Sequence, residues 1–232
     1  MTFDERVMQI LANTNAVITD SHLVYAKGQH GSAYINKDAI YPNPHLVAEL
    51  CAGIARHFCE KGEEYDTVVG PEKGGIILAQ WTAYGSYDAL DPPSGRIIHG
   101  VYAEKVGKDD DGDIFAFTRG YDKFVAGKRV LVVEDILTTG SSVRKVASQV
   151  TSIGGTVVGA GAICNRGGVT AEDVGIAELY ALANVKMDAW EAEFCPLCKE
   201  FRPMNVALGK GRQWLETEAG KAWLASGGSI AA

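Results

Sequence analysis

Two adjacent acids and a hydroxyl-rich turn occur together in the stretch VLVVEDILTTGSS, residues 130–142. The turn leads into a helical pattern, so it offers backbone N–H groups, the positive end of a helix dipole and several hydroxyls to one small volume. This combination predicts a site for a single phosphate group. Its residues are Thr138, Thr139, Gly140, Ser141 and Ser142.

The acids Glu134 and Asp135 predict a second contact beside that phosphate. Adjacent carboxylates can accept hydrogen bonds from a vicinal diol or hold a metal ion, and ribose 5-phosphate carries a diol at about this separation. An acid pair alone is more often a solvated strand end, but the neighbouring TTGSS favours a function. No GxxxxGK[ST] or GxGxxG pattern occurs, so neither a P-loop nor a dinucleotide-binding turn is indicated.

Alternating apolar strands and amphipathic helices must position these residues. This alternation predicts an α/β fold with a parallel sheet covered on both faces and ligands at the carboxyl edge. A capping box at Thr2 and Glu5 predicts an opening helix, and the polar stretch 103–128, with KDDDGD inside it, predicts a mobile loop with a short hairpin. Strands are expected at 66–70, 96–102, 129–134 and 156–164, and further helices from 44, from near 75 and after 142.

The bulk composition limits the class of protein. With 232 residues and 47% hydrophobic content the chain can bury one core, and we expect one domain. The formal charge of -7 argues against a protein that holds nucleic acid by general phosphate attraction. The start MTFDERVMQI carries acids where a secretory signal would carry bases, and no window resembles a membrane span. We therefore expect a soluble cytoplasmic protein with no nucleic-acid or membrane partner.

The five cysteines show no disulfide framework, which suits a reducing compartment. Only CPLC, Cys195 to Cys198, is arranged as half of a zinc site or as a redox pair. No second CxxC and no HxxxH supplies the other ligands, so a tight turn after a helix is favoured and no metal site of protein side chains is predicted. Large aromatics near the end are expected to pack: Trp190, Trp214 and Trp223.

The run VLVVEDILTTGSS closely resembles the phosphoribosyl pyrophosphate (PRPP) motif of type I phosphoribosyltransferases. The resemblance implies that Glu134 and Asp135 contact the ribose hydroxyls and that the segment from Ile136 and Leu137 through Ser142 binds the 5-phosphate. It implies a sheet of about five mostly parallel strands flanked by helices, with a small hood. Residues 1–232 would form one domain, with the hood at about 20–42 plus the C-terminal segment and the core at about 44–184.

Further segments are similar to the orotate phosphoribosyltransferases. GPEKGGIILA, 70–79, looks like that family's pyrophosphate loop and implies PRPP contacts by Glu72, Lys73 and Gly74. GSAYINKDAIYPNP resembles the hood segment over the base, and ICNRGG falls where the family has a base-binding arginine. The base contacts implied by the resemblance are Lys27, Tyr34, Thr138 and Arg166.

The mobile loop departs from the family pattern, which has an arginine, two lysines and a histidine there. In VYAEKVGKDDDGD, Tyr102 and Ala103 stand near expected basic positions, and the histidine is missing. Lys105 and Lys108 remain as PRPP contacts. The hood lysine is also shifted by one position, to Lys27.

The resemblance implies transfer of ribose 5-phosphate from PRPP to a pyrimidine, with orotate as the expected base, giving orotidine 5'-monophosphate and pyrophosphate. Lys105, Glu134 and Asp135 are the expected catalytic residues, Mg²⁺ would accompany PRPP, and a homodimer is implied. Two alternatives stay open: transfer to another base, or a catalytically weakened regulator that binds PRPP or a nucleotide.

Overall fold

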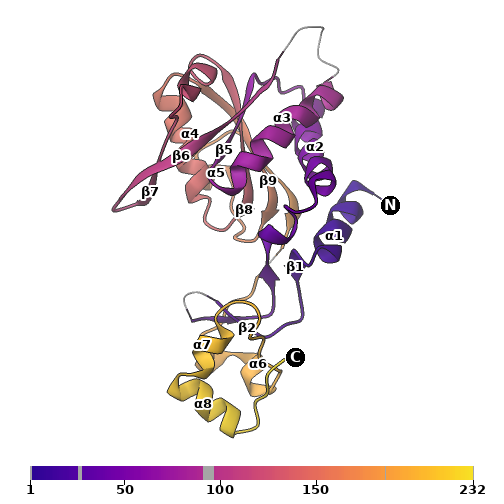
Figure 1. The fold of residues 1–232 in the computed structure, drawn as a ribbon, viewed down its shortest axis with the longest axis vertical. Coiled ribbons are helices and arrows are strands. Elements are labelled where there is room, and N and C mark those ends of the chain that lie inside the picture. The colour runs from indigo at the N-terminus through magenta and orange to yellow at the C-terminus, as the bar shows by residue number, and fades with distance from the viewer. Residues whose placement is uncertain (1, 26–27, 91–96, 186, 232) are drawn as a thin grey trace. The chain divides into compact units, whose positions relative to one another are not determined.

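The computed structural model describes residues 2–25, 28–90, 97–185 and 187–231, and the chain divides into two compact units (Figure 1). The first, called the core unit, comprises Met1–Met8 and Tyr41–Val185. The second, called the terminal unit, comprises Gln9–Ile40 and Lys186–Ala232. The terminal unit is thus built from two segments that are far apart in the sequence.

A six-stranded sheet forms the centre of the core unit, in the order β10-β9-β8-β5-β6-β7. Five neighbouring strands are parallel, and β7 pairs antiparallel with β6 at the edge. The predicted α/β fold with about five mostly parallel strands is confirmed, and β7 is the addition. The strands are β5 (Thr67–Pro71), β6 (His99–Asp109), β7 (Gly112–Ala116), β8 (Arg129–Leu137), β9 (Thr156–Asn165) and β10 (Leu179–Asn184).

Helices cover both faces of the sheet (Figure 1). On one face Val146 of α4 belongs to the same buried cluster as Val132 of β8. On the other face a Cβ added to Gly161 of β9 would lie 2.3 Å from Ile54 of α2, so glycine allows the helix to pack closely. The core unit contains α2 (Pro44–Glu60), α3 (Gly74–Leu90), η2 (Tyr121–Phe124), α4 (Ser141–Ser152) and α5 (Ala171–Val174).

Helix α1 (Phe3–Asn13) begins with the predicted capping box. The Thr2 backbone N–H donates to Oε2 of Glu5 at 2.7 Å, and the Glu5 N–H donates to Oγ1 of Thr2 at 3.2 Å. These two hydrogen bonds satisfy amides that a helix start otherwise leaves unpaired.

The short hairpin predicted within 103–128 is confirmed, and it replaces most of the first half of the expected loop. Strand β6 continues to Asp109, and β7 returns antiparallel from Gly112. The turn is closed by the Asp111 N–H, which donates to Oδ1 of Asp109 at 3.0 Å, and Gly112 takes φ = 102°. The acids of KDDDGD therefore help to close the turn of a hairpin.

The terminal unit has short elements around a small core. Its buried cluster consists of Val24, Cys195, Leu197, Cys198, Met204, Leu215 and Trp223, and Trp190 and Trp214 pack against it, so the predicted packing role of the tryptophans is confirmed. Two-stranded pairs β1–β4 and β2–β3 provide its only sheets among the described residues. Its elements are β1 (Val17–Ile18), β2 (Leu23–Val24), β3 (His30–Gly31), β4 (Tyr34–Ile35), η1 (Lys37–Ala39), η3 (Ala192–Phe194), α6 (Pro196–Lys199), α7 (Gly211–Leu215) and α8 (Glu218–Ala225).

Across the described ranges, no helix combines the length and the apolar character needed to cross a membrane.

Candidate active site

Three predicted segments meet at the carboxyl edge of the sheet. Strands β5, β8 and β9 are neighbours in the order β9-β8-β5, and they end at Pro71, Leu137 and Asn165. Leu137 pairs with Asn165 in the β8–β9 register, so the residues that follow each strand start at the same edge. This is the position at which open parallel sheets bind ligands.

The acid pair lies inside strand β8, which runs three residues beyond its predicted end at 134. Glu134 is 9% exposed and Asp135 4% exposed, so neither is an ordinary solvated strand end. Oδ1 of Asp135 accepts from the Ile136 N–H at 2.7 Å, and Oε1 of Glu134 accepts from the Asp135 N–H at 3.0 Å. Burial of two acids is costly unless hydrogen bonds or cations compensate it, so this arrangement favours a binding role.

Tyr41 is a site residue that sequence reasoning missed. Its hydroxyl donates to Oδ2 of Asp135 at 2.9 Å, across 94 positions of the sequence. This bond and the one from the Ile136 N–H fix both oxygens of the Asp135 carboxylate. The aromatic residue in IYPNP is the one feature of the sequence that could have drawn attention to Tyr41, but nothing in the sequence relates that segment to the acids.

The predicted turn leads into a helix, as the sequence indicates. Gly140 is the N-cap of α4 in the left-handed conformation, φ = 71°, and no side chain caps the helix. Thr138 and Thr139 are exposed before it. The first N–H groups of a 12-residue helix and its dipole therefore face the carboxyl edge. A Cβ on Gly140 would also lie 2.4 Å from Val174, so both the backbone conformation and the lack of space favour glycine at position 140.

The Glu72–Gly74 turn joins β5 to α3 directly beside the acid pair. A Cβ added to Gly74 would lie 1.8 Å from Oδ2 of Asp135 and 2.7 Å from the Tyr41 hydroxyl oxygen. Glycine at this helix start thus allows the backbone to approach the carboxylate. The Glu72 N–H donates to the Ala103 carbonyl at 2.9 Å, the Glu72–Lys73 peptide is cis, and Lys73 is exposed.

Arg166 and Thr138 are brought together after neighbouring strands. Nε of Arg166 donates to Oγ1 of Thr138 at 2.9 Å, and the Arg166 N–H donates to the Leu137 carbonyl at 3.0 Å. A Cβ on Gly167 would lie 1.7 Å from the Thr138 carbonyl oxygen, so glycine permits this contact. Two residues proposed to meet the same base are therefore in contact.

The lysines of the expected loop lie on β6, beyond its pairing with β5, which ends at Pro71 and Ala103. The β6–β7 hairpin therefore extends past the carboxyl edge (Figure 1). Nζ of Lys105 is 2.7 Å from Oδ2 of Asp113, and Nζ of Lys108 is 3.9 Å from Oδ1 of the same residue. The hydrogen bond from Lys105 lowers the pKa of Asp113 from its usual 3.8, so this carboxylate stays ionised.

Neither of the two predicted hood residues belongs to the core unit. Tyr34 belongs to the terminal unit, where it pairs with Ile18 in the β1–β4 ladder. Lys27 lies outside the described residues.

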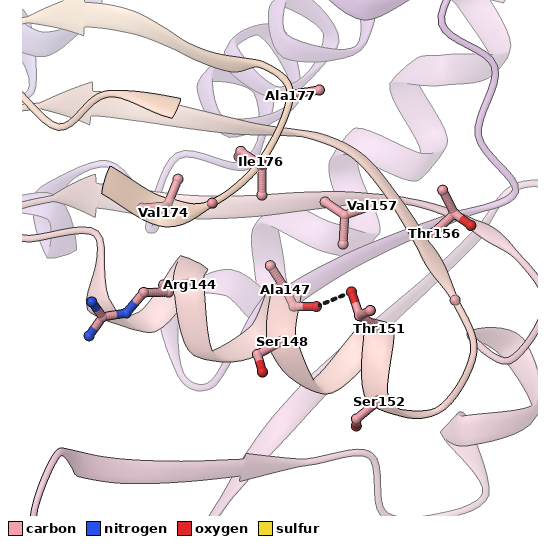
Figure 2. A pocket seen from close by; sticks show the side chains of 12 residues that line it. Arg144, Ala147, Ser148, Thr151, Ser152, Thr156, Val157, Val174, Ile176 and Ala177 are labelled. Carbon is pink, nitrogen blue, oxygen red and sulfur yellow. Dashed lines mark hydrogen bonds between the residues drawn. The ribbon is translucent and has the colours of Figure 1, made fainter. Parts of the chain in front are cut away.

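An open groove of about 660 Å³ contacts α4, the start of β9 and the segment after α5 (Figure 2). Arg144, Val157 and Ile176 are among its lining residues, and the Thr151 hydroxyl donates to the Ala147 carbonyl at 3.0 Å. It includes no acid, histidine or cysteine and no predicted site residue. The groove therefore supplies no acid–base or nucleophilic group to the site.

The family model of the phosphoribosyl transferase domain matches residues 36–195. A relative, the orotate phosphoribosyltransferase of Caldicellulosiruptor bescii, is 33% identical over 197 residues, which are 85% of this chain and 93% of that protein. Among solved structures, orotate phosphoribosyltransferase of Mycobacterium tuberculosis superposes with a TM-score of 0.58 at 20% identity, covering 79% of this chain and 97% of that one. Adenine phosphoribosyltransferase of Saccharomyces cerevisiae gives 0.56 at 17% identity, covering 78% and 98%.

The fold and the carboxyl-edge site define a protein of the phosphoribosyltransferase class. At one third identity over most of its length, the chain belongs to the orotate phosphoribosyltransferase family. The fold is shared with an adenine enzyme, so the base must be argued from the site.

Proposed function

We propose that this protein transfers ribose 5-phosphate from PRPP to orotate, giving orotidine 5'-monophosphate and pyrophosphate. The observation that carries the proposal is the buried pair Glu134 and Asp135 beside the uncapped N-terminus of α4. The M. tuberculosis relative has been solved with PRPP, which supports the same ligand here.

The cradle binds the 5-phosphate and the acids bind the sugar. The N-terminal amides of α4 and the hydroxyls of Thr138–Ser142 meet the phosphate, an anion that suits a helix start. Glu134 and Asp135 accept hydrogen bonds from the ribose 2- and 3-hydroxyls, with Tyr41 holding Asp135 in position. The ribose ring is thereby oriented with its anomeric carbon away from the phosphate.

The pyrophosphate lies between the Glu72–Gly74 turn and the β6–β7 hairpin. In the reaction the bond from the anomeric carbon to pyrophosphate breaks, its electron pair leaves with pyrophosphate, and a base nitrogen forms the new bond. Positive charge develops on the ring and negative charge on the leaving group, so fixed acids and nearby cations stabilise the transition state. Lys73 and Lys105 supply the cations, and Lys108 supports them.

In the proposed reaction, Lys105 must leave Asp113 to bind pyrophosphate. With Asp113 it forms an ion pair in which the lysine side chain is 42% exposed, so the pair is screened and costs little to break. Pyrophosphate, with more charge than one carboxylate, is the stronger partner.

Orotate is favoured as the base because it carries a carboxylate. The planar guanidinium of Arg166 can bind a carboxylate through two parallel hydrogen bonds. Its hydrogen bond to Thr138 orients that fork at the edge where the base must lie. The family resemblance adds Tyr34 and Lys27 as proposed contacts to the base.

Mg²⁺ is the expected cofactor, bound with PRPP. The oxygen-only donor set of Glu134 and Asp135 at the carboxyl edge fits a hard cation that keeps most of its water ligands. When bound, it would neutralise charge on pyrophosphate as that group leaves.

We also propose a homodimer in the cytoplasm. Helix α3 leaves Ile77 38% and Tyr84 64% exposed, and Ile97 after it is 63% exposed, which suits an apolar interface. None of the five cysteines forms a disulfide, which suits a reducing compartment. Light scattering tests the dimer, and Tyr84→Lys is expected to shift the mass toward that of one chain. Tyr180→Lys is the control, because Tyr180 lies on β10 at one edge of the sheet, and it should not change the mass.

The test is pyrophosphate release from PRPP and Mg²⁺ with orotate, uracil, adenine and hypoxanthine supplied separately. Release with orotate alone is expected, and Arg166→Ala should abolish that preference. Release with adenine instead would keep the enzyme and replace the base. PRPP binding without release for any base would point to the regulator, because the cations of the hairpin are few and paired with Asp113.

A further inference from the structure

Four ligand-type side chains of the terminal unit converge on one point: His22, His30, Cys195 and Cys198. One ligand atom of each lies within 4.8 Å of the other three. Nε2 of His22 is 3.1 Å from Nδ1 of His30, and it is 3.7 Å from Sγ of Cys195 and 3.5 Å from Sγ of Cys198. Nδ1 of His30 is 3.3 Å from Sγ of Cys198.

These separations match the edges of a tetrahedron around zinc. Zn–N bonds of about 2.0–2.1 Å and Zn–S bonds of about 2.3 Å give ligand-to-ligand edges of about 3.3–3.8 Å. The four separations given above fall within about 0.2 Å of that range. Four of the six ligand-to-ligand separations are therefore close to those that a bound zinc ion requires, and all six are within 4.8 Å.

Hydrogen bonding alone does not account for the cluster. Nδ1 of His22 lies 2.8 Å from the Arg202 carbonyl oxygen, which only accepts, so Nδ1 carries the proton and Nε2 carries one lone pair. That lone pair can accept one hydrogen bond, yet three polar atoms surround it. A cation at their centre satisfies all of them, and the Arg202 carbonyl then has the usual role of orienting a metal-bound histidine.

Burial and charge point to the same ion. The exposed fraction is 0% for His22, His30 and Cys195 and 9% for Cys198. Two thiolates, two neutral imidazoles and one divalent cation sum to no net charge, which is the condition for burying such groups. Redox-active cysteine pairs are partly exposed, whereas a closed set of two sulfurs and two nitrogens is typical of structural zinc.

The four ligands come from both segments of the terminal unit. His22 directly precedes β2 and His30 begins β3 in the first segment, while Cys195 precedes α6 and Cys198 lies within it in the second. Backbone bridges also join His22 to Met204 and His30 to Trp190, and the apolar cluster that contains both cysteines has seven buried residues. Units of this size and sparse core commonly need a metal or a disulfide.

We propose that His22, His30, Cys195 and Cys198 bind a structural zinc ion that fastens the two chain segments of the terminal unit to each other. His22 binds through Nε2, His30 through Nδ1 and the cysteines as thiolates. The ion has four protein ligands and no open position, so it takes no part in chemistry. The proposal stands apart from the transfer reaction, and either can fail alone.

The first test is metal content of the full chain, purified without chelators and measured by mass spectrometry of the elements. Wild type is expected to carry about one zinc per chain, and Cys195→Ser, Cys198→Ser and His22→Gln to fall below about a tenth of that. Cys59→Ser and His45→Gln, which change the same residue types in the core unit, are matched controls and should keep the wild-type content. A zinc-free wild type, or ligand variants that keep as much zinc as the controls, would overturn the proposal.

A second measurement needs no variant and so does not depend on whether the variants fold. The wild-type chain produced with Co²⁺ in place of zinc should show thiolate-to-cobalt charge transfer and the strong visible bands of tetrahedral coordination. Weak bands of octahedral cobalt would contradict the proposal. A mass lower by two hydrogens, which indicates a Cys195–Cys198 disulfide, would also contradict it.

Discussion

Lys105 places Nζ 2.7 Å from Oδ2 of Asp113, on the opposite strand of its own hairpin. Lys108 approaches the other oxygen of that carboxylate at 3.9 Å. One acid therefore faces both hairpin lysines that the family resemblance assigns to PRPP. In the proposed reaction, Asp113 competes with pyrophosphate for these lysines.

Asp113→Asn removes the negative charge of this side chain and keeps its shape. Because exposed ion pairs are weak, kcat/KM for PRPP should rise only modestly, by about 1.5- to 5-fold. Steady-state kinetics at fixed ionic strength measures it. Asp110→Asn makes the same charge change in the same hairpin and should have a smaller effect; equal rises would show a general charge effect.

Lys105→Ala tests the role of the cation in the transition state. Loss of one group that stabilises developing charge costs about 10²-fold in kcat, while the dissociation constant for PRPP should change by less than about threefold. Rapid-quench kinetics and calorimetry separate the two, with the exposed Lys128→Ala as control. Equal losses of turnover and affinity would count against a transition-state role.

Asp135→Asn should weaken PRPP binding. A hydrogen bond to a charged group contributes about 1.5–3 kcal/mol, so the dissociation constant should rise by at least about tenfold. Calorimetric titration of PRPP with Mg²⁺ gives the value, and Asp122→Asn, an exposed acid on η2, controls for net charge. An unchanged dissociation constant would end the assignment of Asp135 to the ribose.

Tyr41→Phe removes only the hydroxyl that holds Asp135. The expected loss is about 1 kcal/mol, a rise of about fivefold in KM for PRPP with kcat nearly kept. Combined with Asp135→Asn it should add less than it does alone, because asparagine leaves the Tyr41 hydroxyl only a weaker, uncharged partner. Full additivity in that double-mutant cycle would contradict a role through Asp135. Tyr180→Phe, with no hydroxyl hydrogen bond found for it in the described chain, is the control.

The pH dependence of the hairpin follows from Asp113. Its pKa in the folded chain is lowered below the usual 3.8, so its ion pair is fully formed above that pH and is lost only as the pH falls through the lowered pKa. The ratio of kcat/KM between wild type and Asp113→Asn should therefore stay constant from about pH 5.5 to 8.5. An inflection of that ratio near neutrality would show that another group titrates with Asp113.

The phosphate cradle could be predicted because its chemistry is local. A strand, two acids and a turn from Thr138 to Ser142 are consecutive, and Gly140 takes the left-handed conformation that such a turn requires. The family resemblance assigned Arg166 and Thr138 to the same base, and two neighbouring strands that end at one edge bring them into contact.

Other features depend on contacts that no spacing reveals. Tyr41 reaches Asp135 across 94 positions. The short hairpin within 103–128 was predicted, but its extent was not. The Asp111 N–H donates to Asp109 in its turn, and Lys145 of α4 donates to the carbonyls of Asp111 and Asp113.

The zinc ligands were missed for a related reason. Cys195 and Cys198 were seen as half of a site, but the other half was sought in a second CxxC or HxxxH. His22 and His30 are eight positions apart and reach the cysteines only because β2 and β3 pair. A hairpin places two residues together at spacings that a helical motif does not contain.

The most direct test of the central claim is a competition among bases, with the nucleotide products identified by mass spectrometry. The chain is incubated with PRPP, Mg²⁺ and equal concentrations of orotate, uracil and adenine. The proposed function predicts orotidine 5'-monophosphate as the product, and its formation should depend on Arg166, Glu134 and Asp135. Another nucleotide in its place, or none while PRPP is bound, would contradict it.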